Sequence, residues 1–141
     1  MTVAAYEYEH VVTFEETNVV GNVYFSNFVL WQGHCREHFL RDHAPDVLAR
    51  LRDDLVMVTT KVSCSFYAEV FALERVVVEM TLGACAANRL SMRFRYRRGN
   101  DLVATGEQAV ACLRRTADGG LMPEPVPETL ALAASGFVTA V

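Results

Sequence analysis

The sequence predicts an α+β fold in which one long helix packs against one antiparallel sheet. Three observations support this class. Residues 25–43 carry apolar side chains with the period of an amphipathic helix. Residues 89–97 alternate strictly between apolar and polar side chains, as a half-buried strand does. The chain has 141 residues, 52% hydrophobic and 21% charged, so we expect a single domain over residues 1–141 with a buried core.

The composition argues against several functional classes. Thirteen basic and 17 acidic residues give a net charge of -4, which does not favour a general nucleic-acid binder. No apolar run approaches the ~20 residues that a transmembrane helix needs, so we expect no membrane span. Residues 1–10 contain two glutamates and no basic segment, so we expect no signal peptide and a cytoplasmic location. The four cysteines form no CxxC pair and are expected to be free thiols, with no metal and no cofactor.

The first segment predicts a strand followed by a turn. Residues 6–14 read YEYEHVVTF, in which apolar and polar side chains loosely alternate. Residues 15–22 are expected to form a loop, with Asn18 and Gly21 as turn residues. Glycine tolerates backbone angles and close approaches that a side chain forbids.

The long helix is expected to begin near residues 23–27, where Ser26 and Asn27 are candidate caps. It ends before Pro45, because the residue ahead of a proline leaves the helical region. Residues 46–52 are expected to add one short turn.

A helical wheel centred on Gln32 defines the face that this helix should bury. The predicted buried face comprises Phe25, Phe28, Val29, Gln32, Cys35, Arg36, Phe39 and His43. The opposite, polar face comprises Leu30, His34, Glu37, His38 and Arg41. The helix should therefore carry an arginine on the side that faces the sheet.

The rest of the chain predicts an antiparallel meander. The expected strands are residues 55–66, 70–82 (strongest at 75–82), 89–97 and 102–114. In the first of these, Val56, Val58, Thr60, Val62, Cys64 and Phe66 should share one face. Turns are expected at residues 83–88 and 98–101. Glycines at 119 and 120 end the last strand, and residues 128–134 predict a short final helix.

Residues 34–38 read H-C-R-E-H and match the H-x-x-E-H spacing of one class of zinc peptidases. Two histidines four residues apart on a helix are able to share a metal ion. The wheel places His34 and His38 on the polar face, however, and Arg36 between them would oppose a dication. We therefore expect two solvated histidines.

Residues 17–31 read T-N-V-V-G-N-V-Y-F-S-N-F-V-L-W, and C-R-E follows at residues 35–37. This pattern resembles the signature of hot-dog fold thioesterases of the 4-hydroxybenzoyl-CoA thioesterase class. The resemblance covers about residues 5–115. It implies a long central helix wrapped by a five-stranded antiparallel sheet, and a dimer or tetramer with its active sites at the dimer interface.

One position departs from that class, because its catalytic aspartate falls at Asn18. An amide is neither a nucleophile nor a general base at neutral pH. The asparagine, together with Arg36 and the run at residues 58–64, resembles a narrower group, the thioesterases of enediyne polyketide biosynthesis. That resemblance implies a long polyene or β-keto acyl thioester as substrate, carried by the acyl carrier protein of an iterative polyketide synthase.

The chemistry expected from this resemblance rests on Asn18, Arg36 and Phe25. Negative charge develops on the carbonyl oxygen during thioester hydrolysis, so donors must point at it. The backbone N–H of Phe25 near the helix start, the Asn18 NH₂ and the Arg36 guanidinium are the candidates. Substrate contacts are expected at Gly21, Tyr24, Phe28, Thr59 and Thr60, the two threonines reaching a neighbouring subunit.

Alternatives remain open for these residues. Asn18 and Gly21 fit a purely structural turn equally well. Arg36 fits equally well a side chain that lies along the edge of the helix with its guanidinium in water. Four arginines on one strand face are either solvated or a docking site for an acidic carrier protein or a phosphate: Arg89, Arg93, Arg95 and Arg97. The missing acid also admits a non-catalytic acyl-binding or scaffolding partner of the synthase.

Overall fold

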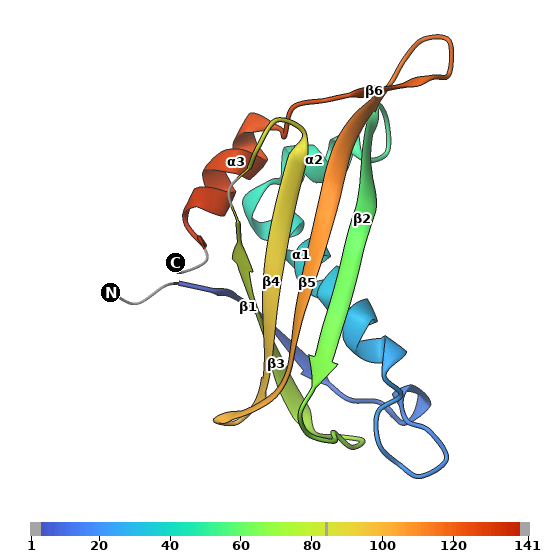
Figure 1. Cartoon of the computed structure of the whole chain (residues 1–141), viewed down its shortest axis with the longest axis vertical. Helices are drawn as coiled ribbons and strands as arrows, with labels where there is room; N and C mark the ends of the chain where they lie inside the picture. The colour runs from blue at the N-terminus through green and yellow to red at the C-terminus, as the bar shows by residue number, and fades with distance from the viewer. Residues whose placement is uncertain (1–3, 84, 139–141) are drawn as a thin grey trace.

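One long helix lies along one face of an antiparallel sheet (Figure 1). The computed structural model describes residues 4–83 and 85–138. Its elements are β1 (Tyr6–Val11), η1 (Phe14–Glu16), α1 (Ser26–His43), α2 (Pro45–Arg50), β2 (Leu55–Phe66), β3 (Arg75–Leu82), β4 (Arg89–Arg98), β5 (Asp101–Arg115), β6 (Leu121–Pro123) and α3 (Glu128–Ser135). The predicted α+β class and the single long helix are confirmed.

The strand order is β1-β3-β4-β5-β2, and the short β6 pairs with the end of β5. The sheet thus has one strand more than the five predicted. Residues 118–120 form the turn that leads into β6, so they end β5 without ending the sheet. Among the described residues, no helix is long and apolar enough to cross a membrane.

The core fills the space between α1 and the sheet face that it covers. Apolar side chains of β4 point into this space and are almost fully buried: Leu90, Met92, Phe94 and Tyr96. The Tyr96 hydroxyl donates to the Phe28 carbonyl oxygen at 2.6 Å, which fastens the first turn of α1 to the middle of the sheet. Burial of this size is the main favourable term that holds the helix in place.

A polar contact inside the core fixes how close the helix comes to the sheet. Gln32 is fully buried, and its Nε2 donates to the Ser63 carbonyl oxygen of β2 at 3.1 Å. The amide passes directly over Gly106 of β5, where an added Cβ would lie 2.2 Å from Gln32 Nε2. Glycine is therefore required at 106 by a close approach of two elements.

A β-bulge changes the face of β2 that points inward. Thr59 pairs with Val110 and Lys61 with Ala109, which leaves Thr60 as the extra residue. Before the bulge, Leu55 and Met57 pack on the core, whereas Cys64 does so after it. The prediction that residues 56–66 keep one alternation is therefore wrong, because a bulge shifts the register by one.

The chain between β1 and α1 is more ordered than predicted. β1 ends at Val11, and residues 14–16 form a 3₁₀ turn capped by Thr13, where the sequence predicts continued strand and then loop. The Glu16 carboxylate accepts from the Trp31 indole at 2.7 Å, from His10 Nε2 at 2.8 Å and from the Thr13 N–H at 2.8 Å. Burial alone would raise the pKa of Glu16, but these hydrogen bonds outweigh it and lower the pKa.

The buried face of α1 differs from the wheel at several positions. The buried residues are Phe28, Trp31, Gln32, Cys35, Phe39 and Leu40. Phe25 is 58% exposed and His43 is exposed, so both were wrongly assigned to the core. The covered face is wider than the wheel predicts, because β1 also packs against α1 beside β3.

Neither predicted cap of α1 forms, since residue 25 occupies the cap position without a side-chain hydrogen bond. Asn27 Nδ2 instead donates to the Glu16 carbonyl oxygen at 2.8 Å. Glu16 therefore ties the 3₁₀ turn to the helix through both its carboxylate and its carbonyl, which holds the loop between them in position.

Replacing Gly106 with alanine should destabilise the fold by about 1–3 kcal/mol, the usual cost of overpacking. The new methyl group would meet the Ser63 carbonyl oxygen at 2.8 Å as well as the Gln32 amide. Chemical denaturation would measure the change. Gly33→Ala is the control, because nothing lies within 4 Å of its added Cβ. Equal stabilities for the two variants would contradict the close approach.

Candidate active site

Asn18 organises a tight turn ahead of the helix. Its carbonyl oxygen accepts the Gly21 N–H at 2.9 Å, and its side-chain Oδ1 accepts the Val20 N–H at 3.0 Å. Gly21 has φ +95°, in the left-handed region that favours glycine. Because Oδ1 is already engaged, the NH₂ of Asn18 is the part of the amide left to donate to a ligand.

The start of α1 presents backbone donors close to this turn. Phe25 has helical backbone angles, and within residues 4–83 and 85–138 no oxygen accepts its N–H. Tyr24 is half exposed and packs its ring against Phe25 at 4.7 Å. The unsatisfied N–H groups of a helix start carry partial positive charge, which favours a developing oxyanion.

An apolar groove of about 310 Å³ opens beside the helix start. Its lining comprises Asn22, Val23, Phe25, Phe28, Phe66, Tyr67, Ala68, Glu69 and Val70. This lining includes Phe28, which is predicted to contact substrate, and Phe25, which is predicted to supply a backbone donor. The groove could accommodate part of an apolar chain next to the free Phe25 N–H.

Arg36 lies ten residues further along α1 and is partly buried. Its guanidinium donates to Gln108 Oε1 of β5 at 3.0 Å. Burial lowers the pKa of Arg36, and only the charge of neighbouring Glu37 opposes the shift. In the part of the chain that the structure describes, no carboxylate lies within ion-pair distance of Arg36. The prediction of an arginine facing the sheet is confirmed.

Asn18 and Arg36 make no contact with each other in the single chain. Arg36 is ten residues beyond the helix start, which is about 15 Å along the axis. Thr59 and Thr60 are exposed on β2, and Thr60 Oγ1 donates to the Ala109 carbonyl oxygen at 3.2 Å. The sequence-predicted residues therefore form two groups, one at the helix start and one near its middle.

His34 and His38 do not form a metal site. His38 Nδ1 bonds the His34 carbonyl oxygen at 2.7 Å, and Tyr8 of β1 packs against both rings. Both histidines are partly buried, so the prediction that they are solvated is wrong. The described residues contain no group of three side chains able to hold a metal ion.

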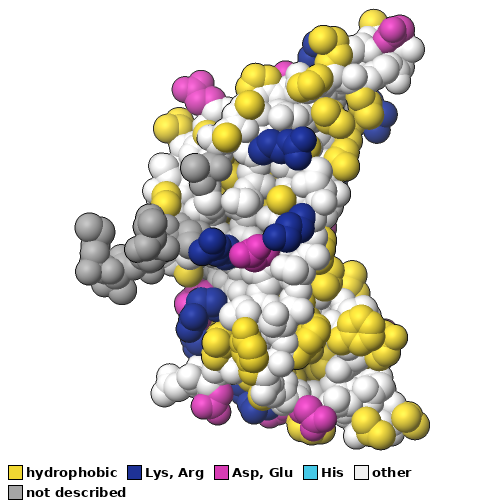
Figure 2. All heavy atoms as spheres, in the orientation of Figure 1, with side chains coloured by type: hydrophobic (Ala, Val, Ile, Leu, Met, Phe, Trp, Pro, Cys, Tyr) yellow, Lys and Arg dark blue, Asp and Glu magenta, His cyan; other side chains and the backbone are white. Residues whose placement is uncertain are grey.

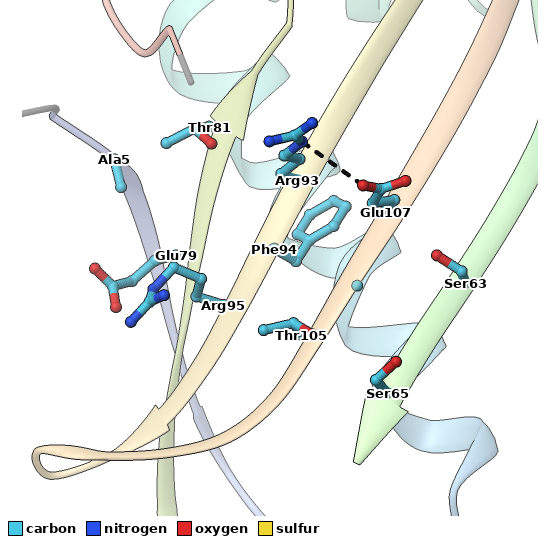
Figure 3. Close-up of a pocket in the computed structure, with 11 residues that line it drawn as sticks. Ala5, Ser63, Ser65, Glu79, Thr81, Arg93, Phe94, Arg95, Thr105 and Glu107 are labelled. Atoms are coloured by element: carbon cyan, nitrogen blue, oxygen red, sulfur yellow. Dashed lines mark ion pairs between the residues drawn. The ribbon is translucent and has the colours of Figure 1, made fainter. Parts of the chain in front are cut away.

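A larger hollow of about 580 Å³ lies on the other face of the sheet, away from α1 (Figure 3). Arg93 pairs with Glu107 across it at 3.6 Å, and Arg97 bridges Glu7 and Glu79 nearby. Figure 2 shows basic and acidic side chains over the middle strands of this face, with apolar side chains along the β2 side. Neither Asn18 nor Arg36 lines this hollow.

Two residues of the site were not found from the sequence. Gln108 holds Arg36, and Glu16 holds the Asn18 loop. A signal for Gln108 does exist, because Gly106 and Gln108 interrupt the buried face of β5 just as Gln32 and Arg36 interrupt that of α1. Thr13 and Glu16 have the T-x-x-E spacing of a capping box, which is a local signal for the 3₁₀ turn. No local pattern marks the bond from Trp31 to Glu16, since these residues lie 15 positions apart.

Comparisons with known proteins agree with the fold. A family model described as the thioesterase-like superfamily matches residues 12–133. A comparison with curated proteins returns no match. Two solved structures share the fold at low identity. A 1,4-dihydroxy-2-naphthoyl-CoA thioesterase from Synechocystis is 19% identical, with TM-score 0.81 over 94% of this chain and 96% of that one. A gentisyl-coenzyme A thioesterase is 16% identical, with TM-score 0.78 over 92% and 98%.

The dynemicin thioesterase, whose crystal structures reveal induced-fit and allosteric effects upon polyene binding, is far more similar. It is 48% identical to this chain, with a TM-score of 0.92 over 97% of this chain and 99% of that one. Identity at this level over nearly the whole length goes beyond a shared fold. Together with the helix against its antiparallel sheet, these matches show that the chain is a hot-dog fold hydrolase that belongs to the thioesterase-like superfamily.

Proposed function

We propose that this chain hydrolyses a long polyene or β-keto acyl thioester from the acyl carrier protein of an enediyne-type polyketide synthase. The observation that carries the proposal is the Arg36 guanidinium, a partly buried cation whose acceptor is a neutral amide. Removing a charge from water without a counter-ion is costly, and such charges are found more often at functional sites. The 48% identity to the dynemicin thioesterase supports the polyene class of substrate.

The proposed reaction needs donors rather than a protein nucleophile. Water attacks the thioester carbonyl carbon, the C–S bond breaks, and the leaving thiolate takes up a proton to give an acid and a thiol. The Phe25 N–H and the Asn18 NH₂ would donate hydrogen bonds to the carbonyl oxygen as it becomes an oxyanion. Arg36 would bind a β-keto oxygen or the oxyanion through a charge-assisted hydrogen bond. A β-keto acid released in this way can then lose CO₂ without a further residue.

A second copy of the chain is proposed to complete the site across β2. This 12-residue strand forms one edge of the sheet, and Val58, Val62 and Phe66 on it are 39%, 42% and 46% exposed. A long edge strand presents unpaired backbone N–H and C=O groups, which readily pair with another strand. Antiparallel pairing of two β2 strands would bring the middles of both helices near one axis, which would bring Arg36 of one copy toward the second. Dimers of this kind could assemble further into a tetramer.

Carrier-protein docking is proposed on charge. The side chains of Arg89 and Arg95 make no ion pair or hydrogen bond with other described residues, so both guanidinium groups remain able to bind carboxylates or a phosphate. Comparing kcat/KM for one acyl chain on a carrier protein and on CoA tests this part of the proposal. A clear preference for CoA would contradict it.

Arg36→Ala should lower kcat for long acyl thioesters by about 10²-fold, the usual cost of losing one oxyanion donor. Free thiol released from purified protein measures turnover, and circular dichroism checks the fold. Arg41→Ala is the control, since Arg41 lies exposed on the same helix and pairs with Asp42. Wild-type turnover in Arg36→Ala would remove Arg36 from the site. Acyl binding without any turnover by the wild type would favour the non-catalytic alternative.

Asn18→Asp should keep the turn, because a carboxylate oxygen can still accept the Val20 N–H. The substitution removes the NH₂ donor and places a negative charge where the oxyanion forms. We therefore expect kcat to fall by at least about tenfold. Turnover equal to or above that of the wild type, measured between pH 6 and 9, would show instead that the site works with a general base.

Val62→Lys should shift the protein from dimer to monomer and abolish most turnover, because lysine on an edge strand opposes pairing. Size-exclusion chromatography with light scattering would measure the assembly. Val11→Lys is the matched control, since Val11 is 45% exposed on β1 at the other edge of the sheet. A Val62→Lys protein that remains dimeric and active would rule out the β2 interface.

A further inference from the structure

Two polar side chains of α1 come close to β5. Gln32 crosses over Gly106, and Arg36 donates to Gln108. Residues i and i+4 of a helix lie about 6 Å apart along its axis, and residues i and i+2 of a strand about 7 Å apart. The two spacings match, so a single position of α1 along β5 allows both contacts.

Gln108 is built into the sheet and has little freedom to move. It is 5% exposed and pairs in register with Val62 of β2 and Met92 of β4. Its Oε1 reaches the Arg36 guanidinium at 3.0 Å, well inside hydrogen-bond range. Arginine has a long side chain with many rotamers, so a fixed acceptor of this kind selects one of them.

The chemistry of this acceptor is unusual for a partly buried arginine. Other arginines among the described residues pair with carboxylates, for example Arg50 with Glu124 and Arg97 with Glu79. Arg36 has an amide instead. A carboxylate at the same place would hold the guanidinium equally well, but it would also neutralise its charge.

We propose that Gln108 is a positioning residue that orients Arg36 and leaves its positive charge available to the substrate. This inference rests on the proposed function, in which Arg36 meets an oxyanion or a keto oxygen. An amide supplies the one acceptor that fixes the guanidinium, and its neutrality leaves the full attraction of the cation for the acyl group. The residue at position 108 therefore determines how strongly Arg36 attracts an oxygen of the acyl group.

The decisive variant is Gln108→Glu, which replaces only an NH₂ by an oxygen. The introduced carboxylate should pair with Arg36, so the melting temperature should stay the same or rise. We expect kcat to fall by at least about tenfold, as on loss of an oxyanion donor, with a smaller change in KM. As the pH falls and the introduced carboxyl becomes protonated, the turnover of Gln108→Glu should approach that of the wild type. A purely structural glutamine would not produce this combination of kept stability and lost kcat.

Two further variants complete the comparison. Gln108→Met keeps the volume and removes the acceptor, so kcat should fall without recovery at low pH. Ala109→Glu is the control for added charge, because Ala109 is the next residue on β5 and alternation places it on the opposite face. Wild-type kcat in Gln108→Glu, or equal losses in Gln108→Glu and Ala109→Glu, would overturn the proposal.

A binding measurement separates this proposal from the proposed function. Calorimetry with hexadecanoate and with the neutral 2-heptadecanone measures the attraction of Arg36 for a negative head group without turnover. The wild type should prefer the carboxylate, and Gln108→Glu should lose this preference by about tenfold or more. A wild type that binds both without turnover contradicts the proposed function alone. An unchanged preference in Gln108→Glu contradicts the role of Gln108 alone.

Discussion

A helix that buries a glutamine and partly buries an arginine can lie against a sheet only where the sheet provides acceptors and space for them. Gln32 finds the Ser63 carbonyl oxygen above a glycine, and Arg36 finds the amide of Gln108. Apolar contacts alone would tolerate small shifts of the helix, because they have no direction. These hydrogen bonds do have direction, and they go to two neighbouring strands, so they fix both the distance and the rotation of α1 over β2 and β5.

The loop that carries Asn18 is positioned by the same helix. Glu16 bonds the indole of Trp31 and, through its carbonyl oxygen, the amide of Asn27, so the turn at Asn18 is held by two residues of α1. Both groups of site residues are therefore placed relative to one rigid element. A site built on regular structure keeps its geometry better than one built on loops alone.

The elements with strong local signals could be predicted from the sequence. The span of α1, the limits of β2 and the alternation of β4 follow from periodicity and from Pro45. The short β6 could not, since it depends on pairing with the end of β5. The 3₁₀ turn has a local signal in the capping box of Thr13 and Glu16, but its attachment to Trp31 does not. For the site, the motif resemblance led to Asn18 and Arg36. Gln108 was missed because a polar residue on the buried face of a strand does not reveal its role until its partner across the core, here Arg36, is known.

The two edges of the sheet differ in a way that limits assembly. Glutamates of β1 are engaged with Arg97 and Arg75 at one edge, whereas the β2 edge is long and exposes valines. A protein whose sheet could pair with other copies at both edges would form open-ended fibres. With only one such edge, strand pairing is complete after two copies, and each copy covers the edge of the other. The charged β1 edge therefore protects this protein from polymerising through the contact that we propose it uses to dimerise.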